Sequence, residues 1–313
     1  MKINRVRQNV FPMLAALIWG TAFVAQSVGA DYVEPFTFNT ARSGVAFIFL
    51  LILCMVLRQV RRRDFDAAAQ PRSGSRRDLI LGGICCGVAL TVATNLQQKG
   101  LETTTSGKAG FITALYIVIV PIAGIFLKKK APRIIWLSVA LAVAGLYCLC
   151  ITEDLTISTG DFYVLLCAFC FSAHILVIDY FTQKVDGVEL SCIQFLVTTV
   201  LSGIGMLATE HPSLEALSMC LWPILYVGIF SSGVAYTLQI LAQKESDPTV
   251  VSLLLSLESV FATLAGALIL HDQMSGKEYF GCVLMLAAVV LAQLPVPTEK
   301  RPERAASGAK MIR

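Results

Sequence analysis

The chain has 313 residues, of which 56% are hydrophobic and only 15% are charged, and its mean hydropathy is +0.72. Soluble domains carry about 25% charged residues, so this composition excludes a water-soluble globular protein. The formal net charge of +4 follows the positive-inside pattern described below. We therefore do not expect nucleic acid as a partner.

Apolar runs of membrane-spanning length recur along the chain. A transmembrane helix needs roughly 17 to 25 mostly apolar residues. Such runs cover residues 9–30, 36–58, 79–98, 104–127, 132–151, 160–182, 190–209, 217–242, 248–270 and 277–294. We predict an all-α integral membrane protein with ten transmembrane helices, followed by a polar tail at 297–313.

Basic residues predict how these spans are oriented. With the N-terminus assigned to the cytoplasm, inside segments carry 21 Lys and Arg residues and outside loops carry three. This bias places both termini in the cytoplasm. The first span also has signal-peptide features, because Lys2, Arg5 and Arg7 precede it and Val28 to Ala30 resemble a cleavage site. Its length and the span that follows at once favour a retained helix in a multi-pass protein of the cell (cytoplasmic) membrane.

The ten cysteines do not describe a disulfide framework. All lie within or at the ends of apolar spans. The Cys167 and Cys170 pair has the CxxC spacing of redox proteins, but here the two residues are one helical turn apart in a predicted span. Small buried thiols are the preferred interpretation.

A shift of 142 positions reveals an internal repeat. The segment that begins at Thr91 aligns without a gap to the segment that begins at Gly233, with about eight of 37 positions identical, among them Gln97 and Gln239. We therefore predict two repeats of five spans, at residues 1–155 and 156–296. An odd number of spans inverts the second repeat in the membrane, an arrangement typical of secondary transporters whose site lies near the midplane.

The chain resembles the EamA-type drug/metabolite transporters with ten spans. The resemblance rests on WGTAF in the first span, Arg42 in the second, the Gln-rich end of the third, SGKAGFITALYIVIVP, SLESVFATLAGALIL, and the last span with Gly281. It implies a five-plus-five inverted repeat and export of small metabolites, among them amino acids. Members commonly carry proline two residues after the glutamate of the ninth span. This chain has Val260 there, so the resemblance does not imply a proline distortion.

Polar residues inside the spans are the candidate substrate-binding residues, because hydrocarbon offers them no hydrogen bonds. Helix–helix hydrogen bonds, worth about 0.6 kcal/mol each, are the structural alternative. Arg42 could also extend outward to the headgroups, and His174 could serve packing alone. The predicted set is Trp19, Asn39, Arg42, Asn95, Gln98, Tyr116, His174, Tyr236, Gln239 and Glu258.

Glu258 is the most informative of these residues. It is the single charge in the run from 250 to 270 and lies about ten residues, or roughly 15 Å, from the cytoplasmic end of its span. A carboxylate in low dielectric holds its proton more readily, so Glu258 is a candidate for proton coupling. It could instead bind a cationic group. Together with Arg42 it would then suit a zwitterion such as an amino acid.

Other classes of function lack their expected residues. A membrane-embedded enzyme needs converging groups such as HExxH or paired acids, and His174, His211 and His271 are scattered. We expect no enzyme activity, cofactor or metal. A channel, or a receptor on a transporter-like fold, stays open as an alternative. The predicted partners are the lipid bilayer and a small molecule. The spacing of Ala262 and Gly266 allows close packing within one chain or in a homodimer.

Overall fold

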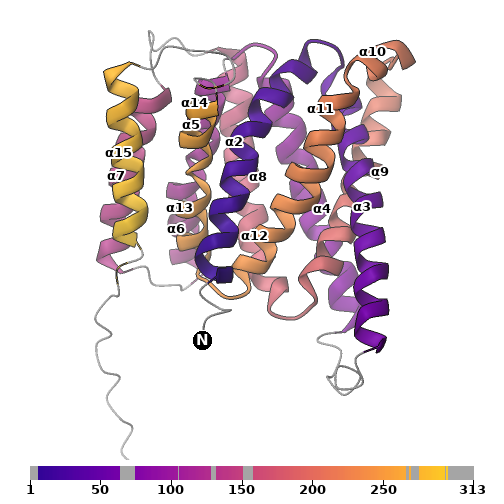
Figure 1. The fold of residues 1–313 in the computed structure, drawn as a ribbon, viewed down its shortest axis with the longest axis horizontal. Coiled ribbons are helices and arrows are strands. Elements are labelled where there is room, and N and C mark those ends of the chain that lie inside the picture. The colour runs from indigo at the N-terminus through magenta and orange to yellow at the C-terminus, as the bar shows by residue number, and fades with distance from the viewer. Residues whose placement is uncertain are drawn as a thin grey trace, which may run out of the picture.

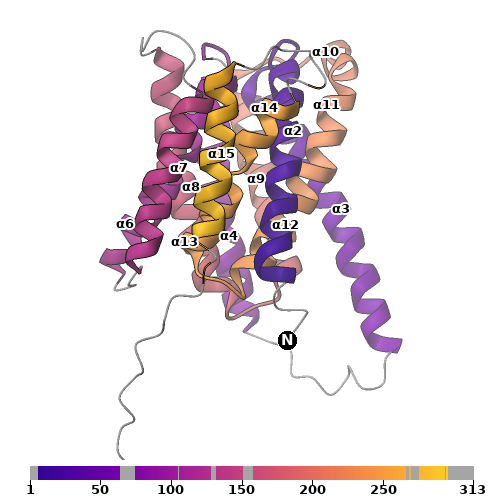
Figure 2. The same ribbon diagram turned by 60° about the vertical axis from the view of Figure 1, so that its left-hand side comes forward.

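The computed structural model describes residues 6–63, 75–104, 106–127, 132–150, 158–265, 268, 275–292 and 294. Within these ranges every regular element is a helix, and the helices lie side by side in one bundle (Figure 1, Figure 2). They are η1 (Val6–Val10), α2 (Phe11–Ala30), α3 (Pro35–Arg63), α4 (Arg76–Gly100), α5 (Ser106–Ala114), α6 (Tyr116–Phe126), α7 (Arg133–Cys150), α8 (Thr159–Thr182), α9 (Gly187–Thr209), α10 (Leu214–Met219), α11 (Leu221–Tyr226), η3 (Val227–Ala235), α12 (Tyr236–Gln243), α13 (Pro248–Leu255), α14 (Glu258–Ala265) and α15 (Gly276–Ala292).

The helices confirm the predicted all-α membrane class. Eight segments of the described chain are long and apolar enough to cross a membrane, and Arg133–Cys148 is a shorter apolar helix. The 17-residue α15 coincides with the last predicted span. These segments are compatible with ten spans and with the predicted repeat, both of which stay predictions.

Large apolar side chains cover the outside of the bundle as well as its interior. Phe126 is 83% exposed, and Leu207 and Trp222 are each 79% exposed. A monomeric protein in water rarely exposes broad apolar surface. An apolar exterior of this kind suits contact with lipid chains, while the interior holds an apolar core, with Phe38, Phe195 and Leu50 fully buried, together with buried polar side chains.

Helices of the two predicted halves alternate in space. The α3 helix packs on α9, α4 packs between α8 and α9, and α2 packs on α14. The last helix, α15, packs on α7, and the two stand at one end of the bundle in Figure 1. The centre of the molecule is therefore formed jointly by both halves.

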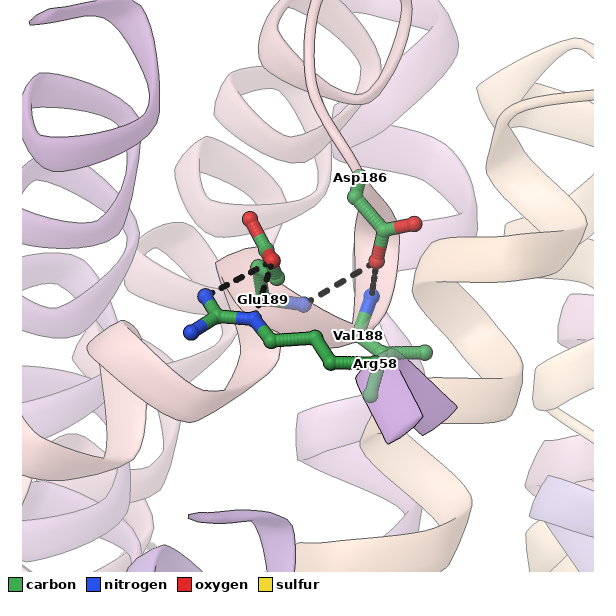
Figure 3. Close-up of polar contacts among 4 residues, drawn as sticks. All are labelled: Arg58, Asp186, Val188 and Glu189. Carbon is green, nitrogen blue, oxygen red and sulfur yellow. Dashed lines mark hydrogen bonds and ion pairs between the residues drawn. The ribbon is translucent and has the colours of Figure 1, made fainter. Parts of the chain in front are cut away.

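One ion pair joins α3 to α9 near the end of the second span. The Arg58 guanidinium donates to Glu189 Oε1 from Nη2 at 2.8 Å and from Nε at 3.1 Å (Figure 3). Asp186 begins α9 as its N-cap and accepts from the backbone N–H of Val188 and Glu189. Both side chains of the pair remain partly exposed, at 64% and 30%.

Three predicted spans are irregular. The fourth breaks at Leu115, between α5 and α6, and the ninth breaks at Ser256 and Leu257, between α13 and α14. The eighth contains the nine-residue π-helix η3. The ninth span breaks without the family's proline. There Ser256 Oγ donates to the Leu253 carbonyl at 2.7 Å, and the Leu257 N–H turns to the Leu254 carbonyl at 3.3 Å.

Candidate functional site

A small cavity of about 40 Å³ lies between the two halves. One water molecule needs about 10 to 15 Å³ by this measure, so the cavity holds roughly three. Residues of α2, α3, α4, α5, α6, α8, η3, α12, α13 and α14 line it: Trp19, Phe23, Gln26, Arg42, Gln97, Thr113, Tyr116, Phe171, Ile175, Ser231, Tyr236, Gln239, Leu255 and Glu258.

The two broken spans meet at this cavity. Tyr116 is the first residue of α6, Glu258 is the first residue of α14, and the Tyr116 hydroxyl donates to Glu258 Oε1 at 3.1 Å. The two residues are 142 positions apart, which is the shift that aligns the predicted repeats. Equivalent breaks thus place a phenol and a carboxylate against each other, and discontinuous helices of this kind typically form transporter sites.

Gly20 brings α2 against the start of α14. A Cβ at position 20 would lie 2.6 Å from Phe261 Cβ and 2.7 Å from both the Glu258 carbonyl oxygen and the Ala262 nitrogen. Two of these three atoms belong to the backbone, so a side chain would force the helices apart. The absence of a Cβ therefore lets α2 approach α14, and Trp19, the preceding residue, lines the same cavity as Glu258.

Arg42 lies inside the bundle and is 3% exposed. Its Nε donates to Asn39 Oδ1 at 2.6 Å and its Nη1 donates to Gln26 Oε1 at 2.9 Å. The sequence allowed Arg42 to extend toward the headgroups. In the structure its side chain points into the bundle instead. Gly228 of η3 approaches the Arg42 carbonyl oxygen so closely that a Cβ would be 2.9 Å away.

Arg42 and Glu258 are buried ionisable side chains without counter-ions among the described residues. Glu258 is 4% exposed. Among the described residues neither side chain forms an ion pair, with the other or with any third residue. Tyr236 lines the same cavity and lies close enough to interact electrostatically with both side chains. The guanidinium and the carboxyl group therefore line one cavity without pairing with each other.

Aromatic side chains form one wall of the cavity around Tyr236. The rings of Trp19 and Tyr236 are 4.7 Å apart between centroids, and the indole Nε1 of Trp19 donates to the Ser231 carbonyl of η3 at 3.3 Å. Behind Tyr236, His174 packs edge-on with centroids 5.9 Å apart and has Nε2 3.1 Å from Gln194 Oε1. His174 thus supports the wall and does not line the cavity.

The structure divides the predicted site residues into two groups. Six line the cavity: Trp19, Arg42, Tyr116, Tyr236, Gln239 and Glu258. The other four lie behind it. Asn39 holds Arg42 and donates to Asn95 Oδ1, Asn95 donates to Ser202 Oγ, Gln98 donates to the Gln26 carbonyl, and His174 packs on Tyr236.

The prediction omitted several lining residues. Phe23, Gln26 and Thr113 share helical faces with predicted ones, so spacing alone could have added them. Gln97 could have been predicted from the repeat, because it aligns with Gln239, a member of the predicted set. Phe171, Ile175, Ser231 and Leu255 carried no signal that separates them from ordinary span residues. Among the described residues, no group of three or more His, Cys, Asp or Glu gathers as a metal site.

Comparison with known proteins identifies the class of this molecule. The model of the EamA-like transporter family matches residues 8–151 and again residues 158–294. An uncharacterized transporter of Archaeoglobus fulgidus is 29% identical over 300 residues, which cover 94% of this chain and 88% of that protein. An uncharacterized transporter of Synechocystis is 23% identical and covers 92% of this chain and 90% of that protein.

A solved crystal structure shares the fold. It superimposes with a TM-score of 0.74 at 17% identity, over 92% of this chain and 96% of that chain. The family match spans both halves and agrees with the interleaved helices and the central cavity. This chain belongs to the EamA-like transporter family and is a multi-pass membrane transporter.

Proposed function

We propose that this transporter binds a small zwitterion, such as an amino acid, between Arg42 and Glu258. The observation that carries the proposal is a buried basic and a buried acidic side chain on one cavity, each without an ion-pair partner among the described residues. An unpaired buried charge is costly. A ligand with a carboxylate and an ammonium group provides a counter-ion for both side chains at once. A ligand without charged groups provides neither counter-ion.

The surroundings of each charge support this assignment. Arg42 uses Nε and Nη1 on neutral oxygens of Asn39 and Gln26, and its Nη2 has no hydrogen bond to the described residues, so it can bind a ligand carboxylate. Within the described ranges Glu258 accepts one hydrogen bond, from Tyr116 on Oε1, which leaves Oε2 for an ammonium group. Planar, charge-assisted pairing of arginine with a carboxylate is among the strongest forms of recognition.

The size of the cavity supports transport by alternating access. A volume of about 40 Å³ is far below the roughly 300 Å³ at which ordinary ligand sites begin. The site must therefore widen to admit an amino acid. The breaks at Leu115 and at Ser256–Leu257 interrupt helix hydrogen bonding beside Tyr116 and Glu258, so bending there opens the site with little other rearrangement.

Export from the cytoplasm across the cell membrane, with both termini cytoplasmic, completes the proposal. Protonation of Glu258 cancels the charge that holds the ammonium group, so proton binding and substrate release exclude each other at one carboxylate. This coupling drives efflux when protons enter from outside. Drug-like organic cations are a second class of substrate, because a carboxylate and the aromatic rings of Trp19 and Tyr236 can bind a cation.

Transport by purified protein in proteoliposomes tests the proposal. Vesicles loaded with a mixture of unlabelled amino acids should accumulate one or more labelled amino acids by counterflow, with saturation. Analogues of each transported amino acid, in which the carboxylate is converted to an amide or the amino group is removed, should compete poorly with the labelled amino acid. Equal competition by these charge-deleted analogues contradicts zwitterion binding. Flux that does not saturate contradicts alternating access.

A further inference from the structure

Gln239 lines the cavity, and its carboxamide has no hydrogen bond to the part of the protein that the structure describes. The side chain is 2% exposed, it lines the cavity, and its Oε1 is buried without a partner among the described residues. Six other described side chains have a buried polar atom of this kind, but none of those six lines the cavity. A buried amide without a partner costs roughly 1 to 3 kcal/mol, so a ligand that satisfies it gains accordingly.

The other half of the molecule shows what a satisfied arrangement looks like. Gln97, the repeat equivalent of Gln239, donates from Nε2 to Thr113 Oγ1 at 3.2 Å. The same 142-residue shift places Leu255 where the first half has Thr113. Both Leu255 and Thr113 line the cavity. Leucine has no hydrogen-bonding group, so in the second half the side chain at this position cannot form a hydrogen bond with Gln239.

We propose that the Gln239 carboxamide binds a neutral polar group on the side chain of the zwitterion, a hydroxyl or a carboxamide. This inference rests on the proposed function, in which Arg42 and Glu258 take the two charged groups. The cavity lining also includes the apolar side chains of Ile175, Phe171 and Leu255. Gln239 is then a specificity-determining residue, which selects threonine-like or asparagine-like side chains over apolar ones of the same shape.

Threonine and valine are the probes, because they differ only by a hydroxyl in place of a methyl group. Their affinities are measured by titrating the thermal stability of purified protein with each amino acid. Threonine should bind roughly tenfold more tightly than valine, the ratio expected for one hydrogen bond near the upper end of its usual net contribution. Asparagine and leucine form a second pair of similar size.

Two variants assign the preference to Gln239. Gln239→Leu keeps the size of the side chain and should reduce the ratio of threonine to valine affinity to about one. Leu255→Thr adds a hydroxyl that can donate to Gln239 Oε1, the atom without a partner, and should likewise lower the ratio. Leu255→Val has the shape of the threonine variant without its hydroxyl and should keep the wild-type ratio. Unfolding midpoints without ligand show whether each variant is folded.

Each outcome decides between the claims. If wild-type protein binds threonine and valine equally, the side-chain assignment is wrong and the zwitterion site stands. The assignment is also wrong if Gln239→Leu weakens both ligands by the same factor, because Gln239 then serves a group that they share, or if Leu255→Thr behaves like Leu255→Val. If folded wild-type protein binds none of the four amino acids, both the inference and the proposed function fail.

Discussion

The close approach of α2 to α14 predicts a large effect from a single methyl group. In Gly20→Ala the new Cβ starts 2.6 Å from Phe261 Cβ and 2.7 Å from two backbone atoms. An ordinary contact begins near 3.4 Å, so the helices must separate by about 0.7 to 0.8 Å at this point. Overpacking of this kind costs about 1 to 3 kcal/mol, against a gain of about 0.5 to 1 kcal/mol for alanine in a helix.

Gly44→Ala is the matched control, since Gly44 also lies within a membrane-spanning helix. Its new Cβ would meet one side-chain carbon, Thr199 Cγ2, at an ordinary 3.6 Å. Thermal unfolding of the two variants in the same detergent should show Gly20→Ala less stable than wild type and Gly44→Ala equal or more stable. Gly20→Ala should also weaken amino-acid binding, because Glu258 moves away from the cavity. Equal stability of the two variants would refute the packing argument.

Three further substitutions test the polar contacts. Glu210 accepts from the backbone N–H of Phe36 and Thr37 at the start of α3, at 2.8 and 2.6 Å, so Glu210→Ala should lower the unfolding free energy by about 1 to 3 kcal/mol. Arg58→Ala removes a partly exposed ion pair and should cost less than about 1 kcal/mol in the same assay; a larger loss would mean that this pair locks α3 to α9. Arg42→Lys keeps the charge but cannot hold Asn39 and Gln26 in a fixed fork, so threonine affinity should fall roughly tenfold or more in the binding titration, and unchanged affinity would contradict carboxylate recognition at this residue.

The membrane class and the central carboxylate could be predicted from the sequence because both depend on composition. A single charge in a long apolar run is visible without any tertiary information, and Glu258 does lie at the cavity. The helix breaks could not be predicted. Neither Leu115 nor Leu257 is a helix-breaking residue, and Pro121, the proline of the fourth span, lies inside α6 and not at the break.

The third span shows why side-chain direction was harder to predict than burial. Its end carries Asn95, Gln97 and Gln98, so polar residues occupy more than one face of α4. The prediction chose the stripe with Asn95 and Gln98, which the structure directs to neighbouring helices. Gln97 faces the cavity instead. Polar spacing on one helix cannot decide its rotation when two faces are polar, because the neighbours decide it.

The most direct test of the account is the binding of threonine and of 3-hydroxybutyrate, its analogue without the amino group, to wild-type protein and to Glu258→Gln. Removing one partner of a buried charge pair costs about 2 to 5 kcal/mol. Wild-type protein should therefore bind threonine at least tenfold more tightly than the analogue, and Glu258→Gln should bind the two about equally while remaining folded. If Glu258→Gln keeps the wild-type preference for threonine, Glu258 does not hold the ammonium group and the zwitterion site is wrong.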